Sequence, residues 1–228
     1  LLKREDLKLV IGDITMPVAV EDKIDYIIHC ASITTSKIMI SRPVDVIRTS
    51  LNGTENLLEL AKEKQVRSMV YVSSMEMYGV LNLQDDQMVT EEMTGYLNPL
   101  ALRSNYPESK RMCENMCVAY GTQYEVPVKI ARLAQTFGAG VLPGENRVFA
   151  QFARSAMKGS DIVLHTEGKS EGNYCYTADA VRALLTILVK GENMQAYNVV
   201  NEKSHITIAD MAKFVAEKIA EKPIEVVF

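Results

Sequence analysis

The chain has 228 residues, of which 47% are hydrophobic and 24% charged, and its formal net charge is −4 at pH 7. This length can bury one sizeable core, and two independent domains are not expected. The small negative charge and the lack of a basic run argue against binding to nucleic acid or to an anionic membrane, so we expect a small ligand. No apolar run is long enough to cross a bilayer, and the 4 cysteines show no Cys-x-x-Cys spacing, which together predict a soluble, cytoplasmic chain with reduced thiols and no metal site.

Hydrophobic segments of two kinds alternate along the chain. The pattern predicts strands at residues 9–11, 26–29, 68–72 and 128–133. It predicts helices starting near Thr54, over 106–119, around 149–156 with Gly159 as the C-terminal stop, around 181–188, and over 211–219 with Thr207 as the N-terminal cap. Strands that alternate with helices favour an α/β fold, in which a parallel sheet is covered by helices on both faces.

Tyr106 and Lys110 are the two residues that point most clearly to a catalytic site. They are four residues apart in a segment where Pro107 is acceptable only in the first turn of a helix, so both side chains lie on one face at the helix mouth. A neighbouring ammonium lowers the pKa of a tyrosine from about 10, as a general base acting on a sugar or alcohol hydroxyl requires. The spacing alone is equally compatible with a solvated helix face.

Seven segments occur in a characteristic order along the chain. They are residues 12–14 (GDI), 25–32 (DYIIHCAS), 52–59 (NGTENLLE), 70–79 (VYVSSMEMYG), 106–110 (YPESK), 132–138 (RLAQTFG) and 176–180 (YTADA). In this succession the chain resembles the extended short-chain dehydrogenase/reductase family, in its NAD-dependent nucleotide-sugar epimerase/dehydratase branch. The resemblance implies a Rossmann-like parallel sheet with helices on both faces, plus a small C-terminal substrate-binding part, with portions at residues 1–136 and 137–228.

The resemblance also implies an NAD site. Asp13 and Ile14 would flank the adenine, and Lys110 would hydrogen-bond the nicotinamide ribose. The other residues assigned to the cofactor are Cys30, Ala31, Ser32, Val72, Ser73, Tyr106 and Leu133.

The implied reaction begins at the sugar 4-hydroxyl. Tyr106 would remove its proton while the C4 hydrogen leaves as hydride, and Ser74 would share the same oxygen, giving a transient 4-keto sugar. Epimerisation, loss of water or loss of carbon dioxide can follow, and Glu76 stands where dehydratases and decarboxylases of the family carry a glutamate. The nucleoside-diphosphate sugar would be bound by Ser74, Gln135, Arg147 and Phe149.

Several positions depart from the family pattern. No Gly-x-x-Gly-x-x-Gly is present, so we expect either a fragment that lacks the first two strands and the glycine-rich loop, or a chain that cannot hold NAD normally. Met75 replaces an aspartate that 4,6-dehydratases use, which weakens the dehydratase interpretation. Ser50 replaces a structural asparagine. Gln135 replaces an asparagine near the substrate and Gly172 an arginine that binds the diphosphate, which leaves the substrate open.

Two other functions remain compatible with the sequence. The same Ser/Tyr/Lys set serves NADP-dependent reductases of aldehydes and ketones, and a cofactor-poor relative could be a regulatory or structural dimer. The helices near 51–65 and 106–120 resemble those that pair in family homodimers. Candidate contacts are Leu57, Leu60, Met112 and Met116, although burial within one chain would explain them equally well.

Overall fold

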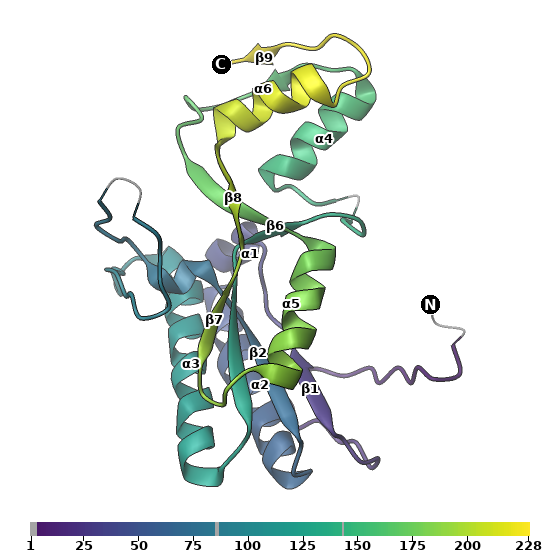
Figure 1. The fold of residues 1–228 in the computed structure, drawn as a ribbon, viewed down its shortest axis with the longest axis vertical. Coiled ribbons are helices and arrows are strands. Elements are labelled where there is room, and N and C mark those ends of the chain that lie inside the picture. Colours follow the sequence, from purple (N-terminus) through teal and green to yellow (C-terminus); the bar gives the residue numbers. More distant parts are fainter. Residues whose placement is uncertain (1–3, 85–86, 143) are drawn as a thin grey trace. The chain divides into compact units, whose positions relative to one another are not determined.

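A computed structural model describes residues 4–84, 87–142 and 144–228 of the chain. The chain divides into two compact units (Figure 1). The first comprises residues 1–132 and 184–198, and the second comprises residues 133–183 and 199–228. The chain thus enters the second unit after residue 132 and returns to the first for residues 184–198.

A four-stranded sheet forms the centre of the first unit. Its strands are β1 (Tyr26–His29), β2 (Ser68–Ser74), β3 (Val128–Leu133) and β7 (Ala196–Val199), in the order β1-β2-β3-β7. β1 runs parallel to β2, with Tyr26 opposite Ser68 and His29 opposite Tyr71. Consecutive residues of β2 and β3 are buried, as expected for a parallel sheet with helices on both faces.

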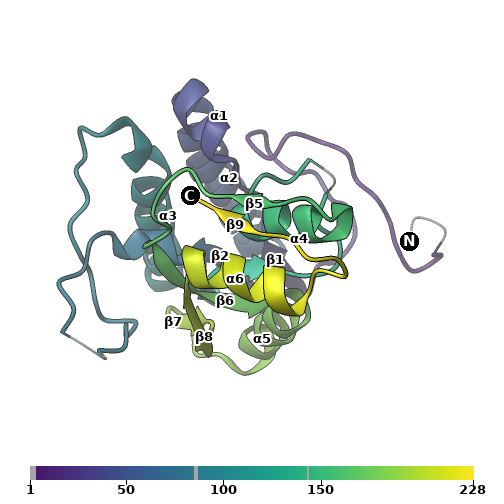
Figure 2. The same ribbon diagram turned by 90° about the horizontal axis from the view of Figure 1, so that it is seen from above.

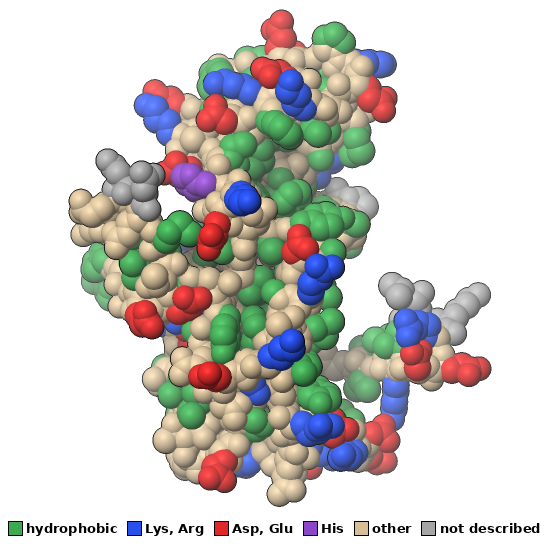
Figure 3. Space-filling model, viewed as in Figure 1, with side chains coloured by type: hydrophobic (Ala, Val, Ile, Leu, Met, Phe, Trp, Pro, Cys, Tyr) green, Lys and Arg blue, Asp and Glu red, His purple; other side chains and the backbone are tan. Residues whose placement is uncertain are grey.

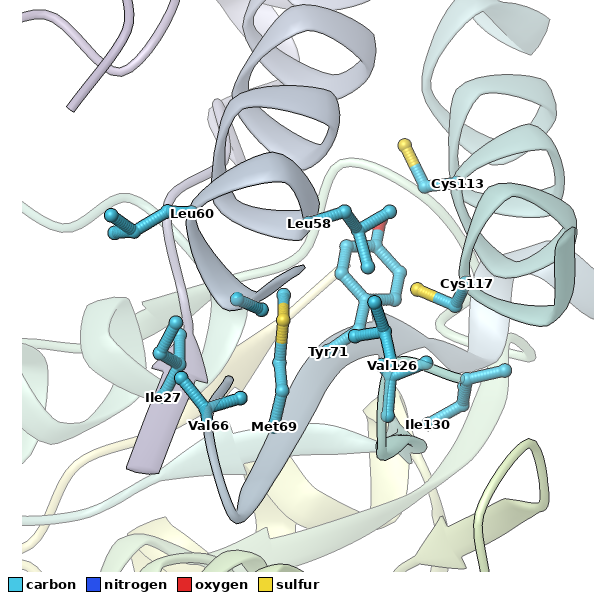
Figure 4. Packing of buried hydrophobic residues seen from close by; sticks show 12 residues of the cluster. Ile27, Leu58, Leu60, Val66, Met69, Tyr71, Cys113, Cys117, Val126 and Ile130 are labelled. Carbon is cyan, nitrogen blue, oxygen red and sulfur yellow. The ribbon is translucent and has the colours of Figure 1, made fainter. Parts of the chain in front are cut away.

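Helices cover this sheet (Figure 1). They are α2 (Pro43–Glu63), α3 (Asn105–Tyr124) and the C-terminal part of α5 (Thr177–Lys190). The short helix α1 (Ser36–Ser41) precedes α2 and packs against it, and the 3-10 helices η1 (Met75–Tyr78) and η2 (Leu102–Ser104) lie in the connection from β2 to α3. α2 and α3 pack on each other and on the sheet, where Leu58, Tyr71, Cys113 and Cys117 are fully buried (Figure 4). The hydroxyl of Ser68 donates to the Leu188 carbonyl of α5 at 2.6 Å.

The second unit contains two small sheets and two helices. β4 (Gln135–Phe137) runs parallel to β6 (Glu171–Tyr176), and β8 (Asn201–Thr207) pairs antiparallel to β6. β5 (Ile162–Val163) pairs in parallel with β9 (Val226–Val227), close to α4 (Val148–Lys158) and α6 (Ile208–Lys218), as Figure 2 shows. Phe152, Ile162, Leu164 and Ala212 form the buried core of these elements.

Several expected elements occur close to their predicted bounds. The strands over 26–29 and 128–133 are confirmed, and the helix predicted over 106–119 extends over Asn105–Tyr124 with Pro107 in its first turn. Gly159 ends α4 with a φ of 65°, and the Thr207 hydroxyl caps α6 by accepting from the Asp210 backbone N–H. Local signals of capping and chain reversal therefore place these helix ends.

Two expectations about elements are wrong. Residues 9–11 form no strand: Leu9, Val10 and Ile11 are 63%, 56% and 89% exposed, and no neighbouring strand pairs with their backbone in the described part of the chain. The helix expected from Thr54 begins at Pro43 instead. Proline is favourable in a first turn and Asp45 complements the helix dipole there, and these short-range features outweigh the weak apolar pattern before residue 54.

The surface carries charges of both signs. Lys and Arg side chains are interspersed with Asp and Glu on the face that Figure 3 displays. Among the residues with described coordinates, no helix is long and apolar enough to cross a membrane, and no group of three or more His, Cys, Asp or Glu side chains could hold a metal ion.

Candidate active site

Lys110 lies between two aromatic rings at the C-terminal end of β2. Its ammonium donates to the Val72 carbonyl at 2.8 Å and lies 4.8 Å from the ring centroid of Tyr71 and 5.7 Å from that of Tyr106. Tyr106 and Lys110 therefore share one face of α3, as a spacing of four residues predicts. An ammonium over an aromatic face is attracted by the ring quadrupole, which holds Lys110 in this position.

Burial controls the ionisation of Lys110. The side chain is only 3% exposed, and this desolvation lowers the pKa of Lys110 from 10.5 to about 8, while Cys113, Glu114 and Cys30 act in the opposite direction. The charge is therefore present at neutral pH but is lost in mildly alkaline solution. His29, the last residue of β1, lies opposite Tyr71, so the loop after β1 begins next to Val72, whose carbonyl accepts from Lys110.

Tyr106 stands in the first turn of α3. Its side chain is 5% exposed and packs in a small apolar cluster with Met39 of α1 and Val46 of α2. The cluster fixes the ring from one side, and the Lys110 ammonium lies on it.

Ser74 and Glu76 lie where β2 passes into η1. The Ser74 hydroxyl accepts from the Glu76 backbone N–H at 3.3 Å and so caps η1. The Glu76 carboxylate receives two hydrogen bonds from the guanidinium of Arg103, at 3.1 Å and 2.9 Å. The Arg103 guanidinium carbon in turn lies 5.8 Å from the Tyr106 ring centroid.

Arg103 was missed by the sequence reasoning. It belongs to η2, three residues before Tyr106, in a stretch that the hydrophobic pattern identifies only as a polar loop. The pair with Glu76 spans 27 positions in sequence, so no helical or strand period indicates it. The position of an arginine just before the helix that begins near Tyr106 was the one feature of the sequence that could have indicated its role.

Arginine side chains also hold the backbone of η1. Arg111 of α3 donates to the carbonyls of Met77 at 2.7 Å, Tyr78 at 3.2 Å and Gly95 at 2.7 Å. Two of these bonds go to carbonyls at the end of η1, and the third goes to the Gly95 carbonyl in the connection to α3. They tie the segment that bears Glu76 to the helix that bears Tyr106.

Ser73 faces a buried ion pair. Its hydroxyl donates to the Glu114 carboxylate, which also receives Arg132 at 2.7 Å, and the side chains of this pair are each 9% exposed. The Ser73 hydroxyl therefore gives its proton to Glu114, so it could meet a cofactor only as a hydrogen-bond acceptor.

The loop after β1 has features that fit a dinucleotide. Cys30 and Ala31 are exposed small residues, and the Ser32 hydroxyl oxygen is buried without a hydrogen-bond partner among the described residues. A buried hydroxyl of this kind is satisfied by a ligand or by water. Together with Lys110 at the end of the neighbouring strand, these residues fit part of NAD.

Asp13 and Ile14 are held near α2. The Asp13 carboxylate accepts from the backbone N–H and the hydroxyl of Thr15, both at 2.9 Å, and these bonds lower the pKa of Asp13. The Ile14 carbonyl accepts from Asn56 at 2.8 Å, and its side chain lies against Gly53, where an added Cβ would meet it at 3.1 Å. Gly53 thus allows close packing of Ile14 on α2.

The remaining expected site residues belong to the second unit. Leu133 ends β3, and Gln135 lies in β4 opposite Tyr174 of β6. Arg147 precedes α4, pairs with Glu145 at 2.7 Å and lies 5.1 Å from the ring centroid of Phe149. The hydrogen bonds from Arg147 lower the pKa of Glu145 to about 2.

A cavity of about 750 Å³ opens within the second unit. Phe149 of α4 lines it together with Phe137 and Tyr174, whose rings are 5.9 Å apart at their centroids, and α6 supplies Phe214 and Met211. The lining is mostly apolar, with Arg154 and Ser204 as polar members. A cavity of this size and character suits a small molecule with an apolar or aromatic part.

Comparison with known proteins identifies the family to which the chain belongs. A model of the NAD dependent epimerase/dehydratase family matches residues 2–201. Among curated proteins, UDP-glucuronic acid decarboxylase 1 of Danio rerio is 29% identical over 96% of this chain and 50% of its own, and UDP-glucuronic acid decarboxylase 6 of Arabidopsis thaliana is 31% identical over 93% and 60%. The chain thus spans about half to three fifths of the length of these relatives.

Solved structures share the fold. An epimerase from Methanothermobacter thermautotrophicus superposes with a TM-score of 0.83 at 23% identity, covering 99% of this chain and 66% of the other. UDP-glucose 4-epimerase of Thermus thermophilus, solved in complex with NAD, gives 0.76 at 26% identity over 89% and 64%. Because the family model matches residues 2–201, which is most of the chain, the chain belongs to the NAD-dependent epimerase/dehydratase family.

Proposed function

We propose that the protein to which this chain belongs modifies a nucleoside-diphosphate sugar by oxidising the sugar C4 hydroxyl to a transient 4-keto intermediate, followed by epimerisation or decarboxylation. The observation that carries the proposal is the placement of the Lys110 ammonium 5.7 Å from the Tyr106 ring centroid, at the end of β2. The family match and the decarboxylases and epimerases among its relatives support the same reaction class.

The proposed cofactor is NAD, which supplies a hydride acceptor when it is bound. Lys110 and the backbone of Val72 and Ser73 would hold it at the end of β2, with Cys30, Ala31 and Ser32 at the end of β1. Asp13 and Ile14 would contact the adenine, and Leu133 is the last of the proposed cofactor contacts. Ser32 offers the buried hydroxyl that still lacks a partner among the described residues.

Three side chains of this chain would share the work of moving the proton. Tyr106 removes the proton from the sugar 4-hydroxyl, the Lys110 ammonium stabilises the resulting phenolate, and the Ser74 hydroxyl holds the same sugar oxygen. Glu76 is the carboxylate nearest in sequence to Ser74 and serves the second step. Gln135, Arg147 and Phe149 are proposed contacts to the nucleotide.

The proposal also includes a cytoplasmic homodimer formed by α2 and α3. Met112 is 51% exposed on α3 and is the candidate contact that the structure leaves most available. Leu60 is 6% exposed within the core, and Leu57 and Met116 pack against the same core, which supports Met112 as the contact to test first. Light scattering of wild type and Met112→Glu tests the dimer, since a charge in an apolar interface should dissociate it.

The activity is tested with the intact protein, NAD and separate nucleotide sugars. We expect conversion of UDP-glucuronic acid or UDP-glucose, with the product identified by mass spectrometry and NMR, because decarboxylation changes the mass and epimerisation does not. Tyr106→Phe should reduce turnover by about 10²-fold or more, since general-base catalysis contributes roughly that factor. Full activity of a folded Tyr106→Phe protein would refute the proposed role of the phenol.

A further inference from the structure

The ion pair between Arg103 and Glu76 is the feature of the first unit that the proposed reaction leaves unexplained. Both guanidinium–carboxylate hydrogen bonds come from one nitrogen of Arg103, and the two side chains are 39% and 38% exposed. The other terminal nitrogen, Nη1, is buried and has no hydrogen-bond partner among the described residues. An isolated surface pair of this kind contributes little to stability, which favours a different reason for its presence.

The backbone on each side of the pair is held in place independently of it. On the η2 side, the Ser104 hydroxyl donates to the Asn98 carbonyl at 2.7 Å, and the Asn105 amide donates to the Met39 carbonyl at 2.8 Å. On the η1 side, Ser74 caps the helix and Arg111 binds its carbonyls. The Arg103–Glu76 pair therefore joins two segments that are already ordered, and it orients side chains more than it orders the backbone.

Tyr106 is flanked by two cations. Arg103 lies 5.8 Å and Lys110 5.7 Å from its ring centroid. The Glu76 carboxylate would bring a negative charge toward the same phenol if it were free to turn, and a like charge opposes formation of a phenolate. Pairing with Arg103 both neutralises that carboxylate and fixes its direction.

We propose that Arg103 is a positioning residue that fixes the direction of the Glu76 carboxylate and compensates its negative charge next to the Tyr106 phenol. The inference rests on the proposed function, because it assigns Glu76 to the second step and Tyr106 to the first. It predicts that the roles of Arg103 and Glu76 depend on each other. Loss of Arg103 alone leaves an unpaired carboxylate beside the phenol, whereas loss of both removes the charge and its partner together.

A double-mutant cycle on the intact protein tests this dependence. The variants are Arg103→Gln, Glu76→Gln and the double variant, with Arg103→Lys as the conservative change. Arg67→Gln is the matched control, because Arg67 also lies over a tyrosine, 5.5 Å from the Tyr26 ring centroid, but at the opposite end of β2. Urea unfolding shows that each variant is folded before kinetics are compared.

Arg103→Gln should lower kcat by about tenfold or more with KM changed less than about threefold, because a residue that acts through Glu76 does not hold the substrate in the ground state. In the Glu76→Gln background, the same change should lower kcat by less than about threefold. Arg103→Lys should recover part of the loss, and Arg67→Gln should behave as wild type. If the effects of the two single variants simply multiply, or if Arg103→Gln raises KM alone, the inference is overturned.

A titration without substrate separates this inference from the proposed reaction. The alkaline titration of Tyr106, taken as the ultraviolet difference between each protein and its Tyr106→Phe derivative, should shift to higher pH by about half a unit or more in Arg103→Gln. The Glu76→Gln change should reverse part of that shift. An inactive wild-type protein would refute the proposed reaction, while an unchanged titration would refute the role of Arg103.

Discussion

Replacing Arg132 by Met breaks a buried ion pair beneath the candidate site. Arg132 of β3 makes three hydrogen bonds to the Glu114 carboxylate, at 3.1, 3.2 and 2.7 Å, and two more from Nη1, to the Tyr78 hydroxyl at 3.0 Å and the Glu91 carbonyl at 2.6 Å. The Tyr78 hydroxyl continues the network to the Asn198 side chain at 2.6 Å. Arg132 of β3 thereby binds α3 and η1 directly, and β7 through the Tyr78 hydroxyl.

The size of the expected stability loss follows from the burial of both charges. With the side chains each 9% exposed, Arg132→Met leaves the Glu114 carboxylate without its ion-pair partner in a poorly hydrated place. Removing one partner of a buried pair costs about 3–5 kcal/mol, against a total stability of about 5–15 kcal/mol for a folded domain. The double variant Glu114→Gln, Arg132→Met should lose less than the sum of the two single variants, because it leaves no unpaired charge.

Urea unfolding followed by circular dichroism measures these changes. The control is Lys23→Gln, which breaks the Lys23–Asp25 pair, whose side chains are 79% and 39% exposed, and should cost about 0–1 kcal/mol. A loss below about 1 kcal/mol for Arg132→Met, or additive losses in the double variant, would refute the reasoning that the pair is coupled and poorly solvated.

Three further predictions concern ionisation and backbone conformation. Burial lowers the pKa of Lys110 from 10.5 to about 8, so between pH 8 and pH 10.5 the unfolded chain binds more protons than the folded chain. The unfolding free energy of wild type, compared with that of Lys110→Met in urea titrations, should therefore rise from pH 8 to 10.5. Burial, and secondly the Lys110 charge, lowers the pKa of His29 from 6.5 to about 4. The contribution of His29 to the unfolding free energy is therefore present above pH 6.5 and is lost as the pH falls to 4. His29→Gln should lose less unfolding free energy than wild type over this acid range. Gly79 has a φ of 68° and an added Cβ would meet the Tyr96 carbonyl oxygen at 2.5 Å, so Gly79→Ala should lower the thermal midpoint and cost about 1–3 kcal/mol. Gly12→Ala, which meets no atom within 4 Å, should be within about 0.5 kcal/mol of wild type, and equal losses in the two glycine variants would contradict this explanation.

The sequence predicted most of the parallel sheet because its signals are local. The strands over 26–29 and 128–133 are short segments rich in apolar residues, although the second also contains Lys129 and Arg132. Gly159 and Thr207 mark helix ends by backbone conformation and by capping. Residues 9–11 show the limit of such signals. An apolar run is a strand only where another strand pairs with it, and its sequence does not state whether a partner is near.

The candidate site, too, was partly determined by the sequence and partly by the tertiary structure. The sequence by itself determined that Tyr106 and Lys110 share a helix face, because the α-helical period places residues four apart together. Only the tertiary structure decided that Glu76 pairs with Arg103 and that the Ser73 hydroxyl is committed to Glu114. These contacts join residues 27 and 41 positions apart, and the packing of strands and helices brings them together without leaving any period in the sequence.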